Sequence, residues 1–193
     1  RFLYGEVRMI GMTVSKVAEY TGGTLHGGGG EREVLGAVRD NREVTPGLMF
    51  CALPGARVDG HDFIGAALEA GAPCCLAQRV PEGVAGPVIT VPDVAKAMAE
   101  LASACRGAVK VPVVGVTGSS GKTTAKEMIA RVLGRKCRTL KTEKNFNNER
   151  GVPLTLFRIG PGTEAAVVEL GISNFGEMHR LGAMARPDIA VYT

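Results

Sequence analysis

A buried strand, a glycine-rich loop and an amphipathic helix follow one another directly between residues 111 and 136. The strand reads VPVVGV, the loop TGSSG and the helix KTTAKEMIARVLGRK. Glycines let the loop turn sharply, so that its N–H groups and the positive end of the helix dipole face the same point. That point suits a phosphate group, and the apolar strand before it is typical of a parallel sheet.

The loop departs from the usual pattern G-x-x-x-x-G-K-[ST], because Val116 stands where that pattern has its first glycine. The parts that act on a nucleotide are retained. Lys122 can offset the charge of the β- and γ-phosphates, and the Thr123 hydroxyl can bind Mg²⁺. We therefore predict an ATP-binding loop that consists of Gly118, Ser119, Ser120, Gly121, Lys122, Thr123 and Thr124.

Two further polar groups stand where strands are expected to end. Glu169 follows four apolar residues, and because burying an unpaired carboxylate is costly, we predict that it shares Mg²⁺ with Thr123. A cap for the following helix is the alternative. Asn147 and Asn148 lie on a loop after another expected strand and are predicted to position a polar acyl substrate. Asn-rich loops are otherwise often only turns.

Strand and helix patterns alternate along the chain, which predicts an α/β fold with a doubly wound sheet. In the first part we expect helices at 13–21, 61–72 and 92–107 and strands at 33–38, 48–53, 73–78 and 87–91. In the second part we expect strands at 111–116, 137–142, 164–170 and 188–193 and helices at 122–136, 152–159 and 174–185. The core face of the helix over 122–136 is predicted to consist of Ala125, Met128, Ile129, Val132 and Leu133.

These patterns give two domains. Residues 12–108 are predicted to form a small N-terminal α/β domain. Residues 109–193 are predicted to form the first part of a P-loop domain with a Rossmann-like, mostly parallel sheet, which we expect to be incomplete at Thr193.

Composition argues against several classes of protein. A net charge of +4 that is evenly mixed gives no case for a nucleic-acid partner, and six Phe, three Tyr and no Trp argue against a base-stacking surface. No apolar run approaches the roughly 20 residues of a membrane span, so we expect no membrane insertion. Without a C-x-x-C motif, the five cysteines are predicted to be core thiols of a cytoplasmic protein.

Three motifs together resemble the Mur ligases of peptidoglycan synthesis: VTGSSGKTT, NFNNERGVPLTL and VVELG. That family's loop reads T-G-[ST]-x-G-K-[ST]-[ST], with its first glycine at the place of Gly118. DNREVTPGLMFCALPGARVDGHDF, residues 40–63, is similar to the family's uridine-binding pattern D-S-R-x-V-x-P-G-x-x-F-x-A-[LR]-x-G-x-x-x-D-G-H-x-F. Asn41 replaces the serine of this pattern, and Arg150 stands where relatives often carry an apolar residue.

The resemblance implies an ATP- and Mg²⁺-dependent ligase that forms a C–N bond through an acyl phosphate. The Asn-Asn-x-x-Gly-Val-Pro signature favours ligation of D-Ala-D-Ala to UDP-N-acetylmuramoyl-tripeptide, a step of cell wall biogenesis on which cell shape and division depend. The alternatives are a Mur ligase that adds a single amino acid, a folylpolyglutamate synthetase-like ligase and, from another class, a non-catalytic nucleotide-sugar binding module.

The resemblance also assigns residues to roles. Lys122 and Glu169 would be catalytic, and Asn41, Arg42 and His61 would bind the UDP substrate, with capping of a helix as the alternative for His61. His179 is interpreted as a surface residue. We expect a monomer, with the ligands of a second metal and a closing domain after residue 193, so that these 193 residues alone would ligate nothing.

Overall fold

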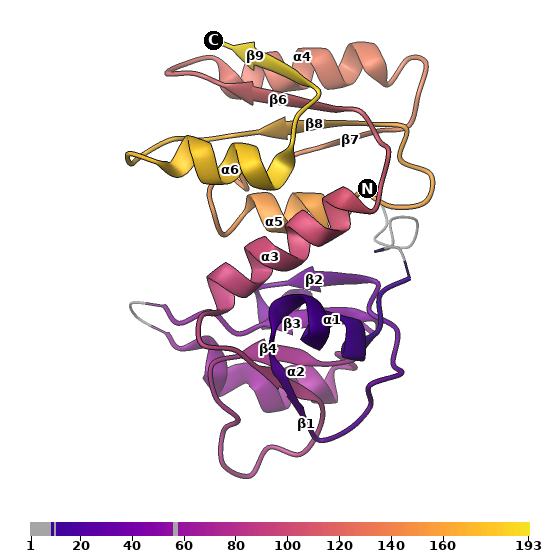
Figure 1. The fold of residues 1–193 in the computed structure, drawn as a ribbon, viewed down its shortest axis with the longest axis vertical. Helices are drawn as coiled ribbons and strands as arrows, with labels where there is room; N and C mark the ends of the chain where they lie inside the picture. The colour runs from indigo at the N-terminus through magenta and orange to yellow at the C-terminus, as the bar shows by residue number, and fades with distance from the viewer. Residues whose placement is uncertain (1–8, 10, 56–57) are drawn as a thin grey trace. The chain divides into compact units, whose positions relative to one another are not determined.

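The computed structural model of the chain describes residues 9, 11–55 and 58–193 (Figure 1). Met9–Leu101 forms one compact unit and Ala102–Thr193 belongs to a second, so that the change of unit falls within helix α3 (Val94–Gly107). The α/β class expected from the sequence is confirmed. The predicted domain boundary, between residues 108 and 109, follows α3 and stays a prediction. Among the described residues, no helix has both the length and the apolar character that crossing a bilayer requires.

A five-stranded sheet of order β1-β5-β4-β3-β2 forms the centre of the first unit. Its pairs are parallel except for β1, which runs antiparallel to β5 and was not expected from the sequence. The strands are β1 (Thr24–His26), β2 (Gly36–Val38), β3 (Leu48–Cys51), β4 (Cys75–Ala77) and β5 (Val88–Thr90). The helices are α1 (Val14–Thr21), α2 (Ile64–Glu69) and the 3-10 turns η1 (Asn41–Glu43) and η2 (Gly60–Phe63).

Sequence signals fix both ends of α1. The Thr13 hydroxyl accepts a hydrogen bond from the Lys16 N–H at 3.4 Å, which caps the first turn. Gly22 ends the helix in the left-handed conformation, with a φ of 59°.

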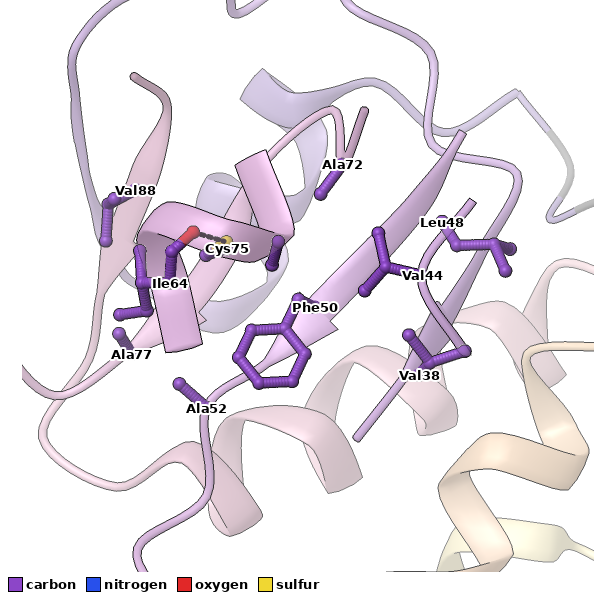
Figure 2. Close-up of a cluster of buried hydrophobic side chains, with 11 residues drawn as sticks. Val38, Val44, Leu48, Phe50, Ala52, Ile64, Ala72, Cys75, Ala77 and Val88 are labelled. Carbon is purple, nitrogen blue, oxygen red and sulfur yellow. Dashed lines mark hydrogen bonds between the residues drawn. The ribbon is translucent and has the colours of Figure 1, made fainter. Parts of the chain in front are cut away.

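One core cluster of this unit lies between the sheet and α2, where Phe50 and Ile64 pack among Val, Ala and Leu side chains (Figure 2). Cys75 belongs to this cluster, and its thiol lies against the Ile64 carbonyl. Burial raises the pKa of Cys75 to about 12. All five cysteines are free thiols, and the interpretation as core residues is confirmed for Cys51, Cys74 and Cys75, which are fully buried, whereas Cys105 and Cys137 are only partly buried.

The second unit contains a four-stranded sheet of order β7-β8-β6-β9 in which every pair is parallel. The strands are β6 (Val113–Thr117), β7 (Thr139–Lys141), β8 (Ala165–Glu169) and β9 (Ile189–Tyr192), and the helices are α4 (Lys122–Leu133), α5 (Val152–Leu156) and α6 (Glu177–Ala185). Helix α4 lies on one side of this sheet and α5 and α6 on the other (Figure 1). The predicted mostly parallel, doubly wound arrangement is thus observed, and the loop after β6 lies at the carboxyl edge.

The core face of α4 differs from the prediction. Ala125, Ile129 and Leu133 do pack against the sheet. Met128 and Val132, however, are 65% and 71% exposed. The apolar stripe read from the sequence is wider than the face that the sheet covers, and the centre of that face is occupied instead by Ala130 and by a lysine, Lys126, that is 2% exposed.

Candidate nucleotide- and metal-binding site

The loop between β6 and α4 needs glycine at 118 for two reasons. Gly118 has a φ of 138°, a conformation that residues with a Cβ rarely adopt. A Cβ on Gly118 would also lie 1.9 Å from the Thr193 carbonyl oxygen, because residue 193 runs beside the loop and accepts a hydrogen bond from the Ser119 N–H. Val116, in contrast, is a fully buried residue of β6, so that the turn begins two residues later than in the usual pattern.

We predict that Gly118→Ala lowers the free energy of unfolding by about 2–4 kcal/mol, because the side chain introduces backbone strain and a clash with a carbonyl oxygen. ATP binding is expected to weaken together with it, since the loop must move. Denaturant unfolding and an ATP titration measure the two effects. Gly182→Ala is the matched control, because Gly182 lies inside α6 and a Cβ added there would meet nothing within 4 Å. Equal stability of the two variants would contradict the prediction.

Lys122 begins α4, and its side chain lies back across the loop. Its Nζ donates a hydrogen bond to the Gly118 carbonyl oxygen at 2.7 Å. The ammonium group is therefore held over the same loop whose N–H groups and helix end favour an anion. A phosphate oxygen there can replace the Gly118 carbonyl as the acceptor of this hydrogen bond.

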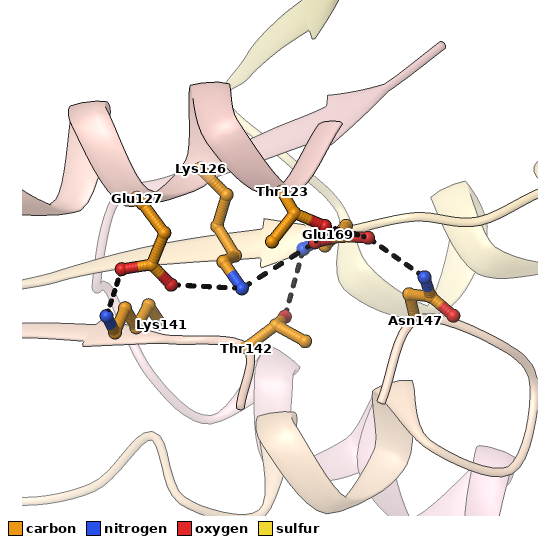
Figure 3. Close-up of polar contacts among 7 residues, drawn as sticks. All are labelled: Thr123, Lys126, Glu127, Lys141, Thr142, Asn147 and Glu169. Atoms are coloured by element: carbon orange, nitrogen blue, oxygen red, sulfur yellow. Dashed lines mark hydrogen bonds and ion pairs between the residues drawn. The ribbon is translucent and has the colours of Figure 1, made fainter. Parts of the chain in front are cut away.

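Glu169 is the last residue of β8 and is 3% exposed. The pairing of β8 with β6 places it opposite Val116, beside the start of the loop. Its carboxylate is surrounded by donors (Figure 3). The Thr123 hydroxyl lies 3.1 and 3.3 Å from the two oxygens, Asn147 Nδ2 donates to Oε1 at 2.9 Å, and Lys126 Nζ lies 3.6 Å from Oε2.

The alternative role for Glu169, a cap for the next helix, is not observed, because its carboxylate contacts Thr123 and Asn147 and the N-cap of α6 has no side-chain hydrogen bond. Glu177, at the start of α6, accepts hydrogen bonds from the N–H groups of Ser173 and Asn174 at 2.6 and 2.8 Å. These contacts hold the pKa of the Glu177 carboxyl below its usual range. The backbone N–H of Glu169 donates to the Thr142 hydroxyl at 2.9 Å, which fixes the end of β8.

The oxygen atoms of this cluster fit Mg²⁺ as ligands. Mg²⁺ prefers oxygen ligands and is usually bound by one or two carboxylates together with phosphates and water. The Thr123 hydroxyl and the Glu169 carboxylate supply such oxygens side by side at the end of the loop that follows β6. Among the described residues there is no group of three or more His, Cys, Asp or Glu side chains that could hold a metal without a nucleotide.

The two neighbouring amides serve different contacts. Asn147 points to Glu169, and its backbone carbonyl accepts a hydrogen bond from the Gly171 N–H at 2.7 Å. The side chain of Asn148 instead accepts a hydrogen bond from the Arg150 N–H at 3.1 Å, within the turn that leads into α5. The structure therefore brings Asn147 to the cluster around Glu169, while Asn148 shapes the loop. A substrate contact of either residue stays a prediction.

The three residues predicted to bind UDP lie in the first unit. Asn41 and Arg42 belong to η1, where the exposed Arg42 guanidinium pairs with Asp40 at 2.6 Å. His61 is 2% exposed and uses both ring nitrogens within the protein. Its Nε2 accepts a hydrogen bond from the Gln78 N–H at 2.9 Å, so the ring proton is on Nδ1, which donates to Asp59 at 2.6 Å.

The cap of η2 is Asp59 and not His61, because the Asp59 carboxylate accepts a hydrogen bond from the His61 N–H at 3.0 Å. The contacts with His61, followed by the one with Arg79, hold the pKa of Asp59 well below its usual range. The binding of UDP by Asn41, Arg42 and His61 stays a prediction.

His61→Ala is expected to lower the free energy of unfolding by about 2–4 kcal/mol, because it leaves a cavity and removes the acceptor of the Gln78 N–H. Denaturant unfolding measures this cost. His179→Ala is the control, since His179 is exposed on α6, as the sequence predicted, and its loss is expected to change stability by less than about 0.5 kcal/mol. If both variants unfold at the same denaturant concentration, the prediction is wrong.

The sequence did not indicate two members of the cluster around Glu169, namely Lys126 and Thr142. The spacing along α4 could have indicated Lys126, because it lies one helical turn after Lys122 and one turn before the buried Ala130, and so on the same face of the helix. Thr142 follows β7, and only the pairing of β7 with β8 brings it to Glu169.

Comparisons with known proteins find similar sequences for both parts of the chain. Residues 116–193 match the model of the Mur ligase middle domain, and residues 38–106 match the model described as "Mur ligase family, catalytic domain". The chain is 43% identical over 190 residues to the UDP-N-acetylmuramoyl-tripeptide–D-alanyl-D-alanine ligase of Bacillus subtilis, which covers 96% of this chain and 41% of that protein. The Escherichia coli enzyme of the same name is 40% identical over 183 residues, 95% of this chain and 40% of that protein. The chain thus spans about two fifths of these relatives.

Solved structures show the same fold. The structure of the UDP-N-acetylmuramoylalanyl-D-glutamyl-2,6-diaminopimelate–D-alanyl-D-alanyl ligase from Acinetobacter baumannii matches with a TM-score of 0.85 at 30% identity, over 97% of this chain and 42% of that one. A MurF ligase from Thermotoga maritima in complex with ADP matches with a TM-score of 0.72 at 39% identity, over 81% of this chain and 36% of that one. The fold, the relatives and both family models place this chain in the Mur ligase family, as its N-terminal and middle domains.

Proposed function

We propose that the complete protein carrying this chain ligates D-Ala-D-Ala to UDP-N-acetylmuramoyl-tripeptide at the expense of ATP. The observation that carries the proposal is the cluster of Lys122, Thr123, Asn147 and Glu169 at the carboxyl edge of β6 and β8. The names of the relatives support the choice of substrates. Because those relatives are longer than this chain, the activity is proposed for the complete protein.

The first step transfers a phosphoryl group. An oxygen of the terminal carboxylate of the tripeptide attacks the γ-phosphorus, the bond between this phosphorus and the β–γ bridging oxygen breaks, and ADP leaves with the electron pair. Lys122 is placed to offset the negative charge on the transferred group, and the loop N–H groups hold the neighbouring phosphates. Mg²⁺, when bound by Thr123 and Glu169, would offset further charge on the β- and γ-phosphates.

The second step forms the amide. The amine of D-Ala-D-Ala attacks the carbonyl carbon of the acyl phosphate, inorganic phosphate leaves with the electrons of the C–O bond, and the nitrogen releases a proton. In this proposal Asn147 positions the acyl group beside the loop, since its amide is already held by Glu169 at 2.9 Å.

Phosphate release by the complete protein tests the proposal. We expect release that requires ATP, UDP-N-acetylmuramoyl-tripeptide and D-Ala-D-Ala together, with the ligated product identified by mass. Replacing D-Ala-D-Ala by free D-Glu, diaminopimelate or Lys is expected to abolish it. Turnover with one of these single amino acids would show that the protein is a different Mur ligase. Binding of the nucleotide sugar without any turnover would favour a non-catalytic module.

The cellular setting is part of the proposal. Free, buried cysteines are typical of a reducing compartment, which supports a cytoplasmic location. ATP as a substrate agrees with this location. The monomeric state stays a prediction and is checked by sedimentation of the complete protein.

A further inference from the structure

We propose that Lys126 is the counter-ion of Glu169 before the metal arrives, and that it makes Mg²⁺ binding depend on bound nucleotide. The inference rests on the proposed function, in which Thr123 and Glu169 hold the metal. Lys126 is a positioning residue in this scheme, because it acts on the reaction only through Glu169.

The geometry singles out this lysine. Its side chain is 3% exposed, and its Nζ lies between two carboxylates, 3.2 Å from Glu127 Oε1 and 3.6 Å from Glu169 Oε2 (Figure 3). Lysine is almost never buried without such partners. Glu127 has a second partner in Lys141, so it does not need Lys126 for a salt bridge, whereas the ion pair with Lys126 is the only one described for Glu169.

Lys126 and Asn147 hold different oxygens of the same carboxylate. Asn147 donates to Oε1, and the ammonium group of Lys126 faces Oε2. The orientation of Glu169 is thereby fixed in the absence of a metal, with the Thr123 hydroxyl against both oxygens. The buried carboxylate can stay ionised and in place between catalytic cycles, because the lysine offsets its charge.

The charges of the side chains around Glu169 explain why Mg²⁺ binding would depend on nucleotide. Lys141, Glu127, Lys126 and Glu169 alternate in sign and sum to zero. Mg²⁺ dehydrates reluctantly, and a carboxylate that is already neutralised attracts it weakly. The phosphates of a nucleotide on the loop supply the missing negative charge. Free Mg²⁺ should therefore bind poorly, and Mg²⁺ together with a nucleotide should bind well.

Removal of the lysine charge from the complete protein tests this inference without any ligation. Lys126→Met is expected to bind Mn²⁺, measured by electron paramagnetic resonance without nucleotide, about tenfold more tightly than the wild type does. Its melting temperature is expected to be lower than that of the wild type in EDTA and to rise by roughly 2–4 °C in millimolar MgCl₂. The wild type is expected to respond to MgCl₂ only when a non-hydrolysable ATP analogue is present.

Two controls accompany the variant. Lys141→Met removes a charge from the same row of ion pairs, but Lys141 pairs with Glu127 and not with Glu169. This variant should therefore bind Mn²⁺ without nucleotide as the wild type does. The double variant Lys126→Met with Glu169→Gln should lose the tighter Mn²⁺ binding that Lys126→Met alone shows. If Lys126→Met does not fold, Lys126→Gln takes its place in the Mn²⁺ measurement.

The outcomes separate this inference from the proposed function. A folded Lys126 variant with no gain in metal binding, or a wild type that binds Mn²⁺ equally well with and without the analogue, would overturn the role of Lys126 and leave the ligase proposal intact. A wild type that binds no metal even with the analogue would overturn both this inference and the assignment of Thr123 and Glu169 as metal ligands.

Discussion

Lys122→Ala is expected to lower kcat/KM of the complete protein for phosphate release by about 10³-fold or more, the range found when a group that offsets charge on a transferred phosphoryl is removed. The ammonium group is already held over the loop by the Gly118 carbonyl, 2.7 Å away, so it needs little rearrangement to reach a phosphate oxygen. No other described cation contacts this carbonyl. Steady-state phosphate release at saturating and at limiting ATP measures the effect.

The control for this variant is Lys136→Ala, which removes the same charge just beyond the other end of the helix, where the side chain is exposed. It should leave kcat/KM within about twofold of the wild type, since exposed charges at that distance are screened by salt. An ATP titration separates the two roles of Lys122, because weaker binding raises KM while loss of charge compensation lowers kcat. Turnover of Lys122→Ala at the wild-type rate would refute the assignment of this loop as the phosphate site.

Much of the second unit could be predicted because its signals are local. The apolar runs of β6 and β8, the glycines of the loop and the position of Glu169 after four apolar residues all lie within short stretches of sequence. The parallel pairing then places Glu169 beside the loop. Strand, loop and carboxylate were therefore predicted together, and the structure brings Thr123 and Glu169 into contact.

What the sequence did not predict depends on contacts between distant residues. The burial of Lys126 follows from its position over the end of β8, and a charged residue in a helix is otherwise expected on the surface. Met128 and Val132 were expected in the core, because spacing marks an apolar stripe without giving the width of the sheet beneath it. Strand β1 has only three residues, and its pairing with β5 joins segments far apart in the chain.

Glu169→Gln is expected to lower kcat by about 10²–10³-fold, because it removes a negative charge. The described side chains that contact this carboxylate are all hydrogen-bond donors or cations, which favour that charge. Asn147 Nδ2, the Thr123 hydroxyl and Lys126 Nζ all face it. A glutamine oxygen can still accept the hydrogen bond from Asn147, but its NH₂ group then faces the ammonium of Lys126. The substitution is nearly isosteric, so the loss comes from charge and not from volume.

The same substitution is expected to lower the free energy of unfolding by about 1–3 kcal/mol, because Lys126 stays buried with one of its two carboxylates gone. Adding Lys126→Met to Glu169→Gln removes the uncompensated charge and should recover part of that stability without recovering activity. Denaturant unfolding and phosphate release of the two single variants and the double variant measure this coupling.

Glu164→Gln, on the exposed pair with Arg138, is the control and should change neither quantity appreciably. If the costs of the two single substitutions simply add in the double variant, Lys126 and Glu169 are not a coupled pair. Stability that recovers while turnover stays low would show that the carboxylate is retained at this position for the reaction, at a cost to the fold that the neighbouring lysine offsets.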